Sequence, residues 1–137
     1  MAVLIDTGVL LGALDADDSY HEVAASVLRR QSDELLVVST VVAETAWQVE
    51  RALGPHAEAA FLDSILAGEL SLVELEHVDY ARSTELIRRY ADLGLGLVDA
   101  SIIAVAERLD ITTVATFNHR DFAVVRPSHV AALILIP

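Results

Sequence analysis

Short runs of branched apolar residues alternate along the chain with longer segments in which apolar residues recur at helical spacing. The first pattern is typical of buried strands and the second of helices that pack on them. We predict strands at residues 2–5, 35–39, 112–116 and 123–125. We predict helices at residues 9–14, 20–30, 40–53, 55–66, 79–93 and 100–109. Residues 70–75 fit a strand or an extended connection, 117–121 fit a loop, and the apolar end at 130–136 is ambiguous.

Strands that alternate with helices predict a largely parallel sheet with helices on both faces. We therefore expect a three-layer α/β/α domain with a mostly parallel sheet of four or five strands. No internal repeat, linker or low-complexity segment divides the chain, so we expect a single domain over residues 1–137. Thr40 and Asp79 are candidate N-caps of the helices that they precede.

Composition narrows the class of protein. Hydrophobic residues make up 54% of the chain, which argues against disorder, and no apolar stretch reaches the length of a membrane helix without a charge. The N-terminus lacks the pattern of a signal peptide, so we expect a cytoplasmic protein with no membrane association. The absence of cysteine excludes disulfides and thiolate metal sites.

The formal net charge of −12 speaks against non-specific binding to a phosphate backbone, which relies on a cationic surface. All nine basic residues other than histidine are arginines. The charge balance suits a protein that binds cations or pairs with a basic partner. The apolar segments also favour a homodimer.

Three acidic residues occupy unusual positions in the predicted fold. Asp6 follows the first strand directly and interrupts an apolar run, so it is expected at the carboxyl edge of the sheet, where such folds bind ligands. Glu44 lies in the first turns of a mostly apolar helix, and Asp99 precedes the most apolar helix. Each has a structural alternative, because Asp6 and Asp99 could be N-caps and Glu44 could be a surface residue.

Three acidic residues at strand ends or helix starts favour a common role for them. Carboxylates gathered at one edge repel one another, and a divalent cation removes that conflict. Mg²⁺ prefers oxygen ligands from a few carboxylates, and such a site can activate water for phosphodiester chemistry. Asn118 and Asp121 follow the predicted strand that Thr116 ends, and could orient a bound water or a carboxylate. An Asx turn with a surface charge is the alternative for this pair.

The chain resembles the PIN-domain nucleases, in particular the VapC-like toxins of bacterial toxin–antitoxin pairs. The matching segments are VLIDTGVLLGALD, SYHEVAASVL, STVVAETAWQV, GLGLVDASIIAVAERLDI and VATFNHRDFAVVRP. They cover nearly the whole chain in the order and spacing of the family, and carry Asp6, Glu44 and Asp99.

The resemblance implies a metal-dependent endoribonuclease. It implies that Asp6 and Asp99 are the principal ligands of Mg²⁺ or Mn²⁺, with Glu44 completing the shell or orienting water. Thr7 and Thr116 match small hydroxyl residues near the metal. Many members have an aspartate where this chain has Asn118, so the fourth acid is absent or replaced by Asp121.

The resemblance also implies partners. These are an RNA substrate, single-stranded or folded as a stem-loop, and a cognate basic antitoxin protein. Arg120 and Arg126 could supply a local cationic path for the substrate.

Two other functions fit parts of the chain. A non-catalytic binding domain could keep the PIN-like fold without activity. The Asp-Thr-Gly at residues 6–8 also matches the active-site signature of aspartic proteases, whose half-size subunits would dimerise so that two Asp6 carboxylates share a proton. The protease fold is almost entirely β, whereas this chain reads as at least half helix.

Overall fold

The computed structural model of the chain describes residues 1–30 and 32–137. Its sheet is five-stranded and entirely parallel, with the strand order β3-β2-β1-β4-β5. The strands are β1 (Ala2–Ile5), β2 (Glu34–Val38), β3 (Ser71–Val73), β4 (Thr113–Ala115) and β5 (Ile134–Ile136). The α-helices are α1 (Thr7–Leu14), α2 (His21–Leu28), α3 (Ser39–Leu53), α4 (Pro55–Leu66), α5 (His77–Arg89), α6 (Leu97–Leu109) and α7 (His119–Val124).

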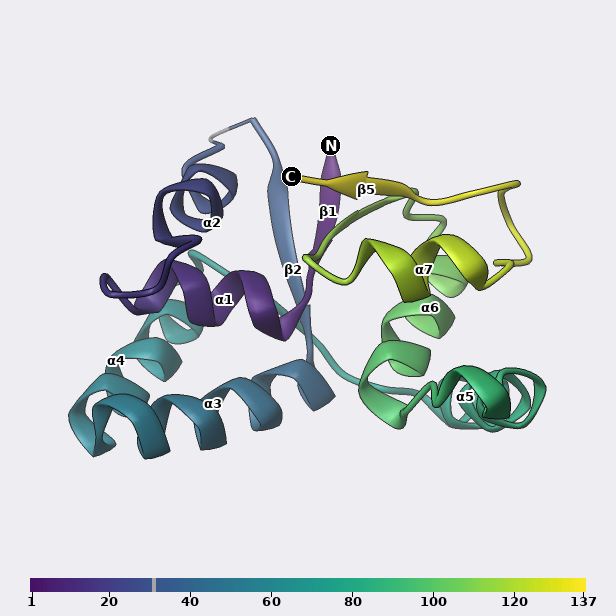
Figure 1. Cartoon of the computed structure of the whole chain (residues 1–137), viewed down its shortest axis with the longest axis horizontal. Helices are drawn as coiled ribbons and strands as arrows, with labels where there is room; N and C mark the ends of the chain where they lie inside the picture. The colour runs from purple at the N-terminus through teal and green to yellow at the C-terminus, as the bar shows by residue number, and fades with distance from the viewer. Residues whose placement is uncertain (31) are drawn as a thin grey trace.

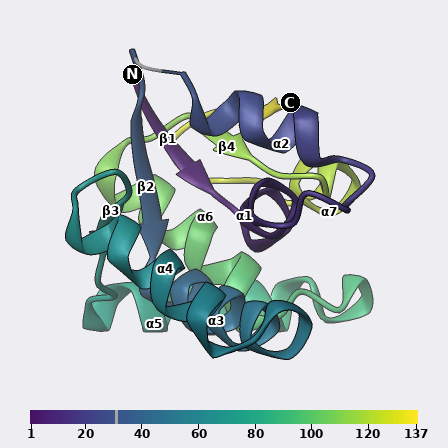
Figure 2. The same ribbon diagram turned by 90° about the vertical axis from the view of Figure 1, so that its left-hand side faces the viewer.

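The helices lie on both faces of the sheet and give the three layers that the sequence predicts (Figures 1 and 2). Parallel strands need crossover connections, which are almost always right-handed. The chain moves from β1 outward to β3 and then crosses back to β4 and β5, so the direction of winding reverses. The reversal places α1 to α4 on one face and α5 to α7 on the other, as Figure 1 shows.

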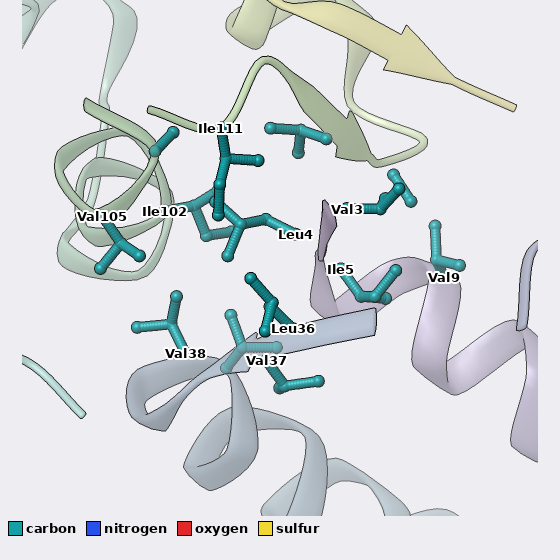
Figure 3. Close-up of a cluster of buried hydrophobic side chains, with 14 of the residues drawn as sticks. Val3, Leu4, Ile5, Val9, Leu36, Val37, Val38, Ile102, Val105 and Ile111 are labelled. Carbon is teal, nitrogen blue, oxygen red and sulfur yellow. The ribbon is translucent and has the colours of Figure 1, made fainter. Parts of the chain in front are cut away.

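The core lies where β1, β2 and α6 meet. Val3, Leu4 and Ile5 of β1 are at most 1% exposed, because helices cover both faces of this central strand. Ile102 and Val105 of α6 pack onto the sheet beside them (Figure 3). Burying each such side chain contributes about 1.5–3 kcal/mol, and this packing holds the start of α6 close to the end of β1.

The winding reverses between β1 and β4, which are neighbours in the sheet. At such a switch point the chain leaves the two strands toward opposite faces, and a crevice opens at their carboxyl ends. The backbone N–H of Asp6 donates to the carbonyl of Ala115 over 2.9 Å, so the two strands remain joined up to their last residues. Asp6 and Thr116, which follow Ile5 and Ala115 directly, therefore lie at this carboxyl edge of the sheet.

The structure corrects the prediction for residues 117–125. We expected a loop and then a strand at 123–125, but this segment forms α7, and the ambiguous end at 130–136 supplies the edge strand β5. Asn118 is the N-cap of α7, with its side chain accepting from the backbone N–H of Asp121. A helix of six residues is too short to show helical periodicity, which explains the error.

Two predicted caps were also misplaced. Helix α5 begins at His77 with Glu76 as its N-cap, and Asp79 is the third helical residue of a reciprocal capping box. Helix α3 begins at Ser39 with Val38 at the N-cap position, so Thr40 lies inside the first turn. Residues 70–75, for which the sequence fits either a strand or an extended connection, contain the short strand β3.

Asp79 makes the first test of the fold. It is buried, and both of its oxygens accept hydrogen bonds over 3.0 Å from Nε of Arg108 on α6. Asp79→Ala leaves Arg108 without this partner and removes the capping box, so we expect the free energy of unfolding to fall by about 3 kcal/mol. Urea denaturation measures the change. Glu85→Ala, which removes a carboxylate with a 68% exposed side chain from the same helix, is the matched control. A loss of equal size in both variants would contradict the assignment.

Candidate active site

Asp6 is held in place by the ends of both central strands. Its Oδ1 accepts from the backbone N–H of Thr7 over 2.8 Å, and its Oδ2 accepts from Oγ1 of Thr116 over 2.7 Å. Asp6 is the N-cap of α1 and only 8% exposed. Burial raises the pKa of its carboxyl, the hydrogen bonds from Thr116 and Thr7 lower it, and the charge of Glu44 raises it. The cap interpretation is correct, but it does not account for the neighbouring acids.

Asp99 is the third residue of α6 rather than its N-cap, which is Gly96. The interpretation of Asp99 as a simple cap is therefore wrong. The pKa of its carboxyl is raised from 3.8 to about 7, most by burial and then by the charges of Asp6, Glu44 and Asp121, in that order of size. These four carboxylates thus act on one another electrostatically, although they come from four separate segments of the chain.

Glu44 lies on α3, whose start is tied to the start of α6 by a hydrogen bond. Oγ1 of Thr40 lies 2.6 Å from Oγ of Ser101. Ser101 donates its own proton to the carbonyl of Val98, so Thr40 is the donor. Thr40 lies one turn before Glu44, and Ser101 lies two residues after Asp99. Sequence reasoning missed this pair, because no local pattern links hydroxyls that are 61 residues apart.

Asn118 and Asp121 extend the network that begins at Asp6. The backbone N–H of Asn118 donates to Oγ1 of Thr116 over 2.9 Å, and Nδ2 of Asn118 donates to Oδ2 of Asp121 over 2.9 Å. The Asx turn expected as an alternative is present, since Asn118 caps α7. In this turn the side-chain amide of Asn118 also orients the carboxylate of Asp121. The turn is therefore part of the candidate site.

The donors gathered here are oxygens, which suits a hard divalent cation. Within residues 1–30 and 32–137, no three His, Cys, Asp or Glu side chains lie close enough together to hold a metal ion as they stand. Oγ1 of Thr7 is buried without a hydrogen-bond partner at this edge. The mutual repulsion of the carboxylates and this unpaired hydroxyl fit a cation that binds with adjustment of the side chains.

Comparisons with known proteins define the class. The PIN domain family matches residues 3–126, and the chain belongs to this family. It is similar to the ribonuclease VapC26 of Mycobacterium tuberculosis, with 28% identity over 135 residues that cover 98% of this chain and 100% of the relative.

Solved structures share the fold. The crystal structure of VapC20 from Mycobacterium tuberculosis, a toxin that cleaves the sarcin–ricin loop, has a TM-score of 0.83 and 20% identity, and the match covers 94% of this chain and 98% of that one. VapBC2 of Rickettsia felis, solved with a fragment of promoter DNA, has a TM-score of 0.70 and 20% identity, with coverage of 98% and 97%.

These results decide against the aspartic protease. The Asp-Thr-Gly at residues 6–8 lies at the junction of a parallel strand and a helix, in a domain with helices on both faces of its sheet. The prediction of a PIN-like three-layer fold is confirmed. Across the described residues, no helix is both long and apolar enough to cross a membrane.

The pKa of Asp99 leads to a prediction about the metal-free protein. Folding raises this pKa from 3.8 to about 7, so the stability that the protonated group gives is present at low pH and lost as the pH rises through about 7. Asp99→Asn cannot ionise, so its melting temperature in chelator should exceed that of the wild type by several degrees near pH 8 and by little near pH 4.5. Thermal denaturation at both pH values measures this, with the exposed Glu50→Gln as control. A variant that is less stable than the wild type at both pH values would show that Asp99 has a purely structural role.

Proposed function

We propose that this protein is a metal-dependent endoribonuclease and the toxin of a toxin–antitoxin pair. The observation that carries the proposal is the electrostatic coupling of Asp6, Glu44, Asp99 and Asp121 at the switch point of the sheet. Like charges held together in a partly buried region reduce stability, and such perturbed groups cluster at functional sites. The similarity to a ribonuclease and to toxin structures supports the same activity.

Each residue has a role in this proposal. Asp6 and Asp99 would hold Mg²⁺ or Mn²⁺, and Glu44 would complete the shell or orient a water molecule. The cation, when bound, supplies activation of water and stabilisation of the leaving oxygen. Thr116 fixes the carboxylate of Asp6, and Asn118 fixes that of Asp121. In this proposal Asp121 would orient the attacking water or accept its proton.

The acidic character of the chain restricts how RNA reaches this site. With a net charge of −12, long-range attraction to phosphate is absent, and contact depends on the cation and on local arginines. Arg120 is exposed in the first turn of α7, one residue from Asp121, and Arg126 is exposed just after that helix. They provide the cationic path beside the carboxylates.

Cleavage tests the site directly. Mg²⁺ or Mn²⁺ should support endonucleolytic cleavage of RNA, and EDTA should abolish it. Asp6→Asn should lower cleavage by at least about a hundredfold and leave the fold intact, because asparagine caps helices about as well as aspartate. Gel analysis of RNA fragments and a melting curve measure both. Asp63→Asn, at an exposed position of α4, is the control.

Two outcomes would contradict this assignment. Cleavage that persists in excess chelator would indicate a metal-independent ribonuclease using His119 or His21. An intact fold that binds neither Mg²⁺ nor Mn²⁺ by calorimetry, and that cleaves no RNA, would identify a non-catalytic binding domain.

Expression tests the toxin function. The wild type alone should arrest the growth of its host, and Asp6→Asn should be tolerated at equal protein level. A small basic protein encoded immediately upstream should restore growth, because its cationic groups would pair with the site carboxylates and exclude the metal. Equal toxicity of both forms would show that growth arrest does not use this site. Relatives of the same fold are solved as toxin–antitoxin complexes, including one from Klebsiella pneumoniae, which supports such a partner.

A further inference from the structure

An open cleft of ≈ 590 Å³ lies beside the candidate active site. Its lining residues are Tyr20, Val23, Phe117, His119 and Pro137. We propose that this cleft binds one unstacked base of the RNA, next to the phosphodiester that is cleaved. The proposal rests on the proposed function and adds a substrate subsite to it.

The cleft is connected to the carboxylates through its central side chain. Phe117 stands between Thr116, which donates to Asp6, and Asn118, which donates to Asp121. The backbone N–H of Asn118 donates to Oγ1 of Thr116, so this three-residue segment is held in one conformation. In a nucleotide a single sugar joins the base to its phosphate. A base against Phe117 therefore belongs to a nucleotide that lies next to the residues holding Asp6 and Asp121.

The walls of the cleft suit a flat ring. The ring centroids of Tyr20 and Phe117 lie 5.1 Å apart at an interplanar angle of 33°, and Tyr20 remains 58% exposed. Unpaired RNA bases are recognised by stacking on such aromatic side chains. His119 is exposed at the rim, where its ring nitrogens can bond to the edge of a base. Stacking surface with a polar rim matches a nucleobase better than an aliphatic side chain.

Both aromatic side chains are positioned before any ligand arrives. Gly8 and Gly12 of α1 lie under Phe117, where a Cβ atom at either position would come within 3.7 Å of the ring. The backbone N–H of Tyr20 donates to Oδ1 of Asp18 over 2.7 Å, which fixes the turn into α2. A cleft whose walls are already ordered loses little conformational entropy on binding.

The charge of the lining points to the same ligand. The chain has 21 acidic residues, yet none of the side chains lining this cleft within the described part of the protein is acidic. Arg120 follows His119 and is exposed. The cleft lining therefore places no carboxylate against a bound nucleotide.

RNA binding in the absence of cleavage tests the subsite. The probe is a fluorescein-labelled single-stranded RNA decamer of mixed sequence, titrated with Ca²⁺ in place of Mg²⁺ or Mn²⁺ and followed by fluorescence anisotropy. Tyr20→Ala should bind about tenfold more weakly, and Tyr20→Phe, which keeps the stacking face, should bind within about twofold of the wild type. The slope of affinity against salt should be unchanged, because no phosphate contact is lost. Tyr80→Ala, which removes an exposed tyrosine from α5, is the matched control.

Photo-crosslinking locates the base. The same decamer is made with 5-iodouridine at successive positions, irradiated with the protein and analysed by mass spectrometry. A crosslink to Tyr20 or Phe117 from one position supports the subsite. Crosslinks confined to other residues would overturn it.

Different results would overturn the base subsite and the ribonuclease activity. If Tyr20→Ala binds and cleaves RNA as the wild type does, the base subsite is wrong and the ribonuclease stands. If Tyr20→Ala loses RNA affinity but the wild type cleaves nothing with Mg²⁺ or Mn²⁺, the base-binding cleft is supported and the ribonuclease is wrong. If Tyr20→Ala changes the molecular mass in solution and leaves RNA affinity unchanged, the cleft is a protein contact and the inference is overturned.

Discussion

The hydrogen bond from Thr116 to Asp6, 2.7 Å long, is the interaction on which the site depends. It joins the residues that follow the two central strands, at the point where the winding of the sheet reverses. A buried carboxylate without partners would be strongly disfavoured, and this bond and the one from Thr7 satisfy one lone pair on each oxygen of Asp6. The remaining lone pairs stay available. Asp6 is therefore fixed in position without being neutralised.

Asp6 and Asp79 differ in the charges that surround them. Both carboxylates are buried. Asp79 forms an ion pair with the guanidinium of Arg108, which compensates its charge and ties α5 to α6. Asp6 receives only neutral donors, and the charges that act on it and on Asp99 are negative. In the proposed function, repulsion between the site carboxylates lowers the stability of the free protein, and a bound cation removes that repulsion. Stability and cation affinity are thus linked through the same carboxylates.

The parts of this structure that sequence could predict are those set by local pattern. Apolar runs located β1 and β2. Because Asp6 directly follows the run at residues 2–5, it could be assigned to the carboxyl edge of the sheet. The errors arose where a helix is too short to show a period or where a distant contact decides the structure. Helix α7 is stabilised by the Asn118 cap, and β5 forms only because β4 offers it an edge. The Thr40–Ser101 hydrogen bond ties the helix that carries Glu44 to the helix that carries Asp99, and no periodicity could indicate it.

The strongly negative charge of the chain has a consequence for the RNA that the proposed enzyme can use. A protein that neutralises many phosphates gains affinity for any duplex, and this chain has nine arginines against 21 acids. Its affinity must then come from short-range contacts, which are the cation, a few arginines and the aromatic cleft. Inserting a base into that cleft first requires the base to leave its stack, at a cost of about a few kcal/mol when it is paired. Without general electrostatic attraction to offset this cost, the accessible targets are bases that are already unpaired, in single strands and in the loops of stem-loops.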